Sequence, residues 1–163
     1  MKEVVNLNPV PLAEKYTSQP FHDTIKVYPI DLYMCKECGH VQILDIIDSS
    51  TLWDDYTYHS GQTKGIIKHF EEIAETVFEK YKLSKKNLVI DIGSNDGSLL
   101  RPFKNMGYNV LGVDPARAIA KEATESGIET IPEILTMKLA KRIRKNYGSA
   151  SLVTAFNVFA HTD

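Results

Sequence analysis

One stretch constrains the fold of this chain more than any other, and it reads NLVIDIGSNDGSLL over residues 87–100. Four of its first six residues are apolar, and three of these are consecutive, which is typical of a strand that is buried on both faces of a parallel sheet. Gly93 and Gly97 follow, and glycine adopts backbone angles that are closed to other residues. A helix is predicted to begin directly after this turn. Strand, glycine turn and helix in this order predict the first unit of a doubly wound α/β sheet.

The rest of the C-terminal half repeats this alternation. Strands are predicted over 87–92, 109–113, 128–131 and 151–158, and helices over 99–106, 116–126 and 137–147. Thr136 is placed to cap the last of these helices, and Gly148 to end it. An amphipathic helix over 66–81 precedes them. Such alternation predicts a parallel, Rossmann-like sheet.

The last predicted strand, at residues 151–158, lies close to the end of the chain. A strand at the edge of a sheet presents unpaired backbone groups to which a further strand can add. We therefore expect this chain to be part of a longer or split protein. Self-association or a partner chain would then cover the open edge.

Three regions are predicted along the chain. Residues 1–50 contain short strands and most of the prolines. Residues 51–86 contain an aromatic arm, WDDYTYHSG at 53–61, and the long helix, and residues 87–163 form the Rossmann-like half-domain. The first region is predicted to resemble a zinc knuckle, because its two cysteines lie on one tight turn.

The cysteine turn reads CKECGH and contains Cys35 and Cys38. Two thiolates on such a turn can share a tetrahedral zinc ion, which normally takes four ligands. The ligand set is therefore incomplete, and His22 and His40 are substitutes that no spacing requires. A knuckle without metal is one alternative. A redox pair is a weaker one, because no thioredoxin-like strand and helix surround the motif.

The net charge, the apolar runs and the cysteines of the sequence exclude several classes of protein. The net charge of −2 argues against nucleic acid or an anionic membrane as the main partner. No apolar run is long enough to cross a bilayer, and the N-terminus lacks the apolar block of a signal peptide. The two cysteines are too close together to form a disulfide framework. We expect a cytoplasmic protein.

The residues around the glycine turn indicate which ligand it binds. A phosphate-binding P-loop would need a lysine after Gly97, and a dinucleotide turn would need glycine where Asn95 stands. Asp91 and Asp96 flank the turn, and carboxylates attract a cation rather than a pyrophosphate. Asp114 ends the second strand, where an acid can accept hydrogen bonds from ribose hydroxyls. A ligand with a ribose, a positive charge and no phosphate fits, and S-adenosylmethionine is such a ligand.

These motifs resemble those of class I S-adenosylmethionine-dependent methyltransferases. More narrowly, the chain resembles the deoxysugar C-methyltransferase family, whose members methylate a ring carbon of a nucleotide-linked keto-sugar. The matching pieces, which run in the family's order, are residues 11–13, 28–30, 35–42, 56–60, 91–100, 111–116 and 157–161. The family also has an upstream cysteine pair, which this sequence does not contain. The resemblance implies a nucleotide-sugar substrate, an enolate formed beside the ketone, and a base from a region C-terminal to the last strand.

The candidate site combines the turn with residues that the resemblance implies. The predicted cofactor-binding residues are Asp91, Gly93, Ser94, Asn95, Asp96, Gly97, Asp114, Pro115, Glu133, Asn157 and Ser60, and the catalytic candidates are His161, Tyr56 and Tyr58. The arm with the two tyrosines is implied to lie over cofactor and substrate. Two other functions stay open: a non-catalytic module that binds the cofactor or assembles with another chain, and a nicotinamide-dependent oxidoreductase, which Asn95 disfavours.

Overall fold

The computed structural model describes residues 1–13, 25–53 and 56–161. It divides the chain into two compact units, Met1–Leu52 and Trp53–Asp163. This boundary lies close to the predicted end of the cysteine-containing region.

The first unit consists of short antiparallel strands. They are β1 (Lys2–Val5), β2 (Val10–Pro11), β3 (Val27–Tyr28), β4 (Leu32–Met34) and β5 (Val41–Gln42). They form a three-stranded sheet in the order β1-β4-β5 and a separate β2-β3 pair. The cysteine turn connects β4 to β5. Among the described residues of this unit, no side chain is buried.

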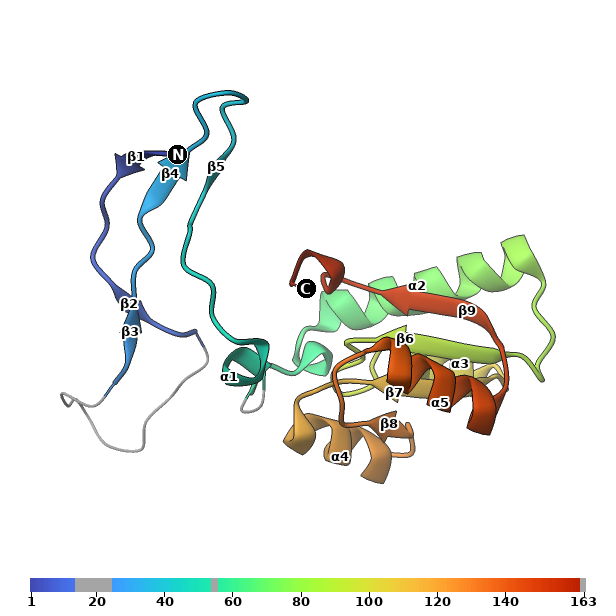
Figure 1. The fold of residues 1–163 in the computed structure, drawn as a ribbon. Coiled ribbons are helices and arrows are strands. Elements are labelled where there is room, and N and C mark those ends of the chain that lie inside the picture. The colour runs from blue at the N-terminus through green and yellow to red at the C-terminus, as the bar shows by residue number, and fades with distance from the viewer. Residues whose placement is uncertain (14–24, 54–55, 162–163) are drawn as a thin grey trace. The chain divides into compact units, whose positions relative to one another are not determined.

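The second unit contains one parallel sheet, and helices connect its strands along the chain (Figure 1). Its first elements are the end of helix α1 (Ser49–Trp53), a 3₁₀ turn η1 (Ser60–Gln62) and the long helix α2 (Lys64–Tyr81). The sheet and its helices follow as β6 (Leu88–Ile92), α3 (Leu100–Asn105), β7 (Asn109–Val113), α4 (Arg117–Glu125), β8 (Thr130–Ile131), α5 (Met137–Tyr147), β9 (Ala150–Ala155) and the 3₁₀ turn η2 (Phe159–His161).

The strand order is β8-β7-β6-β9, so the chain reverses direction across the sheet after β8. β6 pairs in parallel with both β7 and β9, and all five of its residues are buried. Val89 packs with residues of α2 and α3 on one face, whereas Leu88, Ile90 and Ile92 pack with Leu139 and other residues of α5 and the strands. The α/β Rossmann-like fold predicted from the sequence is confirmed.

Two of the predictions concern the start of α5 and the end of β9. Thr136 caps α5, because its side-chain oxygen accepts a hydrogen bond from the Leu139 N–H at 3.1 Å. β9 ends at Ala155, three residues before the predicted end at 158. Ala155 pairs with Ile92, the last residue of β6, and beyond it Asn157 has a left-handed φ of 54° that cannot continue a strand.

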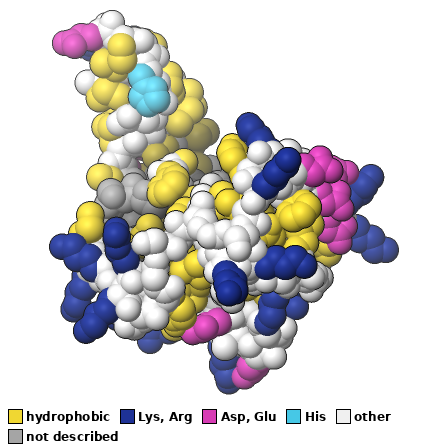
Figure 2. Space-filling model, turned by 90° about the vertical axis from the view of Figure 1, so that its right-hand side faces the viewer, with side chains coloured by type: hydrophobic (Ala, Val, Ile, Leu, Met, Phe, Trp, Pro, Cys, Tyr) yellow, Lys and Arg dark blue, Asp and Glu magenta, His cyan; other side chains and the backbone are white. Residues whose placement is uncertain are grey.

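Side chains of both charges are distributed over the surface seen in Figure 2, with apolar patches between them. Across the described ranges, no helix combines the length and the apolar character that a bilayer crossing requires.

Candidate functional site

The turn after β6 is held against the end of β7. The N–H groups of Gly93 and Ser94 both donate to the carbonyl oxygen of Val113, at 2.7 and 3.2 Å. Gly93, Asn95 and Gly97 have φ values of 68°, 50° and 78°. These left-handed angles let the chain turn sharply out of the strand. The carboxyl ends of β6 and β7 therefore meet at one edge of the sheet, where a doubly wound fold binds its ligands.

The missing side chains of the two glycines make room for the protein itself. A Cβ atom on Gly93 would lie 2.4 Å from Cγ2 of Val158, and one on Gly97 would lie 2.8 Å from Ile128. In the structure, Val158, which follows β9, occupies the space beside Gly93. The turn and the segment after β9 are thus packed directly against one another.

Asp114 lies at the end of β7 and is 6% exposed. Its Oδ2 accepts a hydrogen bond from the Asn95 N–H at 2.7 Å, and its Oδ1 accepts one from the Ala116 N–H at 2.9 Å. Burial raises the pKa of this carboxyl, and the two backbone donors oppose the rise. Each oxygen retains a second lone pair for a ligand. Pro115 follows it and is half-buried.

Asp91 lies inside the end of β6 and is 4% exposed. Its Oδ1 accepts a hydrogen bond from the Thr154 hydroxyl of β9 at 2.7 Å. Burial raises the pKa of Asp91 to about 7, and the charge of Asp114 contributes in the same direction. Thr154 was not predicted as part of the site. The signal that could have identified it is register, because β9 pairs Thr154 with Asp91.

The aromatic arm is attached to the glycine turn through two side chains. Asn95 accepts a hydrogen bond from the Ser60 N–H at 2.9 Å and donates from Nδ2 to the Tyr58 carbonyl oxygen at 2.8 Å. Oδ2 of Asp96 accepts a hydrogen bond from the Gly61 N–H at 2.7 Å. Asn95 and Asp96, predicted as cofactor-binding residues, thus hold the arm in this structure. Their direct contact with a cofactor stays a prediction.

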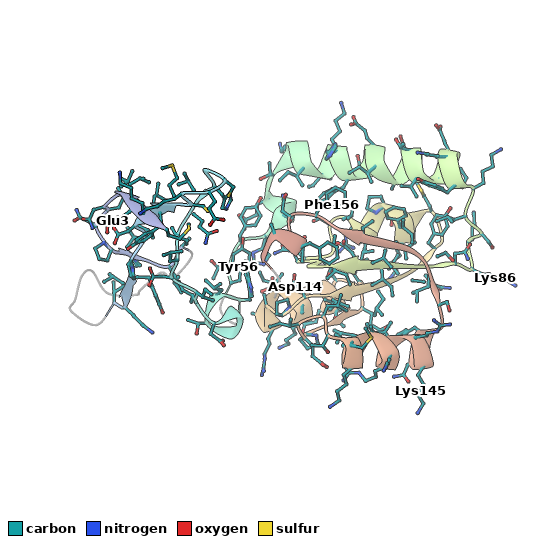
Figure 3. All side chains as sticks on the ribbon, turned by 45° about the horizontal axis from the view of Figure 1, so that its top comes forward. Glu3, Tyr56, Lys86, Asp114, Lys145 and Phe156 are labelled. Atoms are coloured by element: carbon teal, nitrogen blue, oxygen red, sulfur yellow. The ribbon has the colours of Figure 1, made fainter. Side chains whose placement is uncertain are left out.

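The arm brings a row of aromatic rings to this edge. The ring of Tyr56 lies edge-on to that of Trp53, with centroids 5.4 Å apart, and 6.4 Å from the ring of Tyr58. Tyr58 is 38% exposed. Figure 3 shows Tyr56 and Asp114 at the same end of the sheet, with Lys86 and Lys145 at the other. The two catalytic tyrosine candidates therefore lie on the side of the glycine turn.

Other predicted site residues make different contacts. The hydroxyl of Ser94 is buried without a hydrogen-bond partner among the described residues, and it packs against Gly112, where a Cβ would lie 2.4 Å from it. Glu133 pairs with Arg142 of α5, and both side chains are about half exposed. Asn157 is exposed beyond β9. The His161 backbone belongs to η2, but its side chain lies outside the described part of the chain.

The cysteine turn of the first unit has the hydrogen bonds of a tight knuckle. The Cys35 N–H donates to the His40 carbonyl oxygen at 2.8 Å, and the Gly39 N–H donates to the Cys35 carbonyl oxygen at 3.0 Å. The backbone N–H groups of Cys38 and Glu37, with the Cys38 side chain, lower the pKa of the Cys35 thiol. A stabilised thiolate is what a metal ion requires.

Two thiols alone do not make a complete metal site. Cys35 is half-buried and Cys38 is exposed, and both are free cysteines. Among the residues that the structure describes, no group of three or more Cys, His, Asp or Glu side chains could hold a metal ion. His22 lies outside the described ranges. Cysteine thiolates are suitable zinc ligands, but these two alone do not supply the four ligands of a structural zinc site.

Comparison with known proteins supplies independent information. Residues 1–53 match a protein family described as "Putative zinc binding domain". The chain is 33% identical over 135 residues to the C-methyltransferase NovU from Streptomyces niveus, an alignment that covers 83% of this chain and 32% of that protein. The chain thus spans about a third of the length of this curated relative. The resemblance predicted from the sequence, to a C-methyltransferase with an N-terminal zinc-binding region, is confirmed.

Solved methyltransferase structures also align with part of the chain. The magnesium protoporphyrin IX methyltransferase of Synechocystis PCC 6803, with bound S-adenosylmethionine, has a TM-score of 0.46 and 17% identity, covering 61% of this chain and 48% of that one. The plantazolicin methyltransferase BpumL, in complex with S-adenosylhomocysteine, has a TM-score of 0.33 and 17% identity, covering 40% and 26%.

Proposed function

We propose that this chain is the cofactor-binding part of an S-adenosylmethionine-dependent C-methyltransferase. The similarity to a C-methyltransferase over most of the chain supports this function. The structural observation that carries the proposal is the buried carboxylate of Asp114 at the end of β7, fixed by two backbone N–H groups beside the glycine turn. An acid held there is oriented to accept hydrogen bonds from two ribose hydroxyls.

The charges at this edge favour a cationic ligand over a phosphate. Asp91 and Asp114 are both buried at the ends of adjacent strands. In a low-dielectric site, carboxylates stabilise an ammonium or sulfonium group and repel a pyrophosphate. Asp114 would hold the ribose and Asp91 the positively charged end of the cofactor. Asn95 and Asp96 would act mainly by keeping the arm in place.

We further propose that the substrate is a nucleotide-linked keto-deoxysugar, methylated at a carbon beside its ketone. When bound, the cofactor supplies an electrophilic methyl group. A carbon beside a ketone becomes nucleophilic when a base removes its proton and the enolate forms. Tyr56 and Tyr58 have hydroxyl groups that can hydrogen-bond the sugar or its carbonyl. His161 is the candidate for proton transfer, because histidine is the side chain whose ordinary pKa lies near neutral pH.

A non-catalytic module is the second candidate. The observation that favours it is the outer edge of β9, which has no partner strand among the described residues. Val153 on this strand is 56% exposed. Methyl transfer by this chain alone would contradict the module. An oxidoreductase has less support, because Asn95 takes the place of the middle glycine of a dinucleotide turn.

Calorimetric titration of S-adenosylhomocysteine into the whole chain tests the proposal. We expect one-to-one binding that Asp114→Asn weakens by about tenfold or more, because the amide loses a charged acceptor. Glu125→Gln, an exposed acid of α4 that pairs with Lys121, is the matched control and should bind normally. Binding of NADH in place of S-adenosylhomocysteine, or equal binding by Asp114→Asn, would contradict the proposal.

A further inference from the structure

His59 lies in the middle of the arm, and each of its ring nitrogens faces an oxygen atom. Nδ1 is 2.9 Å from the carbonyl oxygen of Thr57, and Nε2 is 2.9 Å from Oε2 of Glu122 on α4. A carbonyl oxygen can only accept a hydrogen bond, and the same is true of a carboxylate. Both ring nitrogens must therefore donate. Only the doubly protonated, positively charged imidazolium can do so.

The groups around His59 favour this charged form. The hydrogen bond to Glu122 makes the largest contribution to raising the pKa of His59, and partial burial opposes it. The Thr57 carbonyl and the charge of Asp96 raise the pKa further. Glu122 belongs to α4 and Asp96 to the glycine turn. Acidic groups thus act on the ring from both of the elements that the arm contacts.

The contact between His59 and Glu122 extends the attachment of the arm. Tyr58, Ser60 and Gly61 are bound through their backbones to the glycine turn. His59 lies among them and reaches the helix that follows Asp114. The arm is therefore fastened both to the turn after β6 and to α4, the helix that follows β7.

We propose that His59 is a positioning residue, which in its imidazolium form ties the arm to Glu122 and so keeps it in the arrangement that binds the ligand of the glycine turn. This inference rests on the proposed function for the identity of that ligand. We call the Thr57–His59–Glu122 contacts the clamp. The protonation state of His59 in the clamp does not depend on the proposed function. His59 acts through the arm and need not touch a ligand.

The clamp should depend on pH in a defined direction. A histidine whose pKa is raised by folding contributes most below its ordinary pKa of about 6.5, and the contribution is lost as pH rises through the raised value. Loss of the proton removes one donor and breaks one of the two hydrogen bonds. The arm should thus be held more tightly at pH 6 than at pH 9.

Nuclear magnetic resonance of the whole chain tests the clamp directly. The His59 signal is assigned by its absence in His59→Gln, and its pKa is measured in the wild type, Glu122→Gln and Glu125→Gln. We expect a pKa above the ordinary histidine value in the wild type and in Glu125→Gln, and a lower one in Glu122→Gln. A wild-type pKa at or below the ordinary value, or one that Glu122→Gln leaves unchanged, would overturn the proposal whether or not a ligand binds.

Calorimetry with S-adenosylhomocysteine at pH 6 and pH 9 tests the positioning role. Asp91 also titrates in this range, so the readout is the difference between the wild-type and variant profiles. We expect His59→Gln and Glu122→Gln to bind about two- to five-fold more weakly than the wild type at pH 6, the size of one exposed ion pair. The difference should become smaller at pH 9, where the neutral imidazole keeps only one of its two hydrogen bonds. Identical profiles in all proteins would overturn the positioning role. Failure of every protein to bind would instead contradict the proposed function, and the resonance titration would still decide the clamp.

Discussion

At the scale of single residues, Asp91 illustrates how a site can reduce the stability of its own fold. Folding raises its pKa from 3.8 to about 7 because the carboxyl is buried. Between these values the unfolded chain binds fewer protons than the folded chain, so this residue makes stability fall as pH rises from about 4 to about 7. Above pH 7 the folded protein holds a buried charge with one hydroxyl partner, Thr154.

Asp91→Asn should therefore stabilise the protein and impair its binding. The amide has nearly the same shape and keeps an acceptor for Thr154, and it carries no charge to bury. We expect the free energy of unfolding in urea to increase by about 1–3 kcal/mol at pH 8, with the difference disappearing near pH 4. Affinity for S-adenosylhomocysteine should fall about tenfold. Lower stability of the variant at pH 8 would contradict the assignment of a buried carboxyl whose pKa is raised by burial.

Gly93 provides a second prediction at this scale. Gly93→Ala adds a methyl group at a left-handed φ of 68° and places it 2.4 Å from Val158. We expect a loss of about 2–4 kcal/mol in the free energy of unfolding, of which the backbone strain accounts for about 1–2 kcal/mol. In a Val158→Ala background the contact is relieved and the backbone strain alone should remain. Equal losses in both backgrounds, measured by urea unfolding, would show that Val158 does not fill this space.

At the scale of elements, the arm and the glycine turn form one assembly through the amide of Asn95. This residue has a left-handed φ of 50°, and its side chain forms hydrogen bonds with the backbones of Tyr58 and Ser60. Backbone conformation and arm attachment can be separated by two substitutions. Asn95→Gly keeps the left-handed backbone without steric strain and removes both hydrogen bonds, whereas Asn95→Ala removes the bonds and also strains the turn.

We expect Asn95→Gly to release the arm without weakening the sheet. Hydrogen exchange of the Ser60 amide should become about tenfold faster, the effect of losing one hydrogen bond of about 1 kcal/mol or slightly more. The unfolding midpoint in urea should change little in Asn95→Gly and fall in Asn95→Ala. Unchanged exchange at Ser60 in Asn95→Gly would show that Asn95 does not hold the arm.

The elements differ in how far the sequence predicted them, and the reasons are physical. β6 was predicted closely, because a strand that is buried on both faces is mostly apolar, and Asp91 is the one polar residue in Leu88–Ile92. The end of β9 was not, because Phe156 and Val158 continue an apolar pattern while the single left-handed residue between them bends the chain. The arm contacts were also missed. Asn95 and Asp96 bind backbone groups some 35 positions earlier, and no local pattern specifies such partners.

At the scale of the whole molecule, the two units differ in how they can be stabilised. The buried apolar side chains run from Ala74 to Ile143 and all lie in the second unit. The described part of the first unit has none, and a domain of about 50 residues without a core usually depends on a metal, disulfides or a partner. Its two cysteines are free and one thiolate is already stabilised by backbone N–H groups. We propose that zinc stabilises this unit.

Cobalt substitution is the sharpest test of that proposal, because thiolate-bound Co²⁺ absorbs light in a way that aqueous Co²⁺ does not. We expect the whole chain to bind Co²⁺ with a thiolate charge-transfer band that Zn²⁺ abolishes and that Cys35→Ser and Cys38→Ser each reduce. Chelation should unfold the first unit and leave the urea transition of the second unit in place, because metal binding and folding are coupled only where the ligands lie. One metal per two chains would mean that two copies share a Cys₄ site, whereas one per chain would require ligands from outside the described residues. Absence of the band, with a first unit that stays folded in chelator, would contradict a metal role for this knuckle.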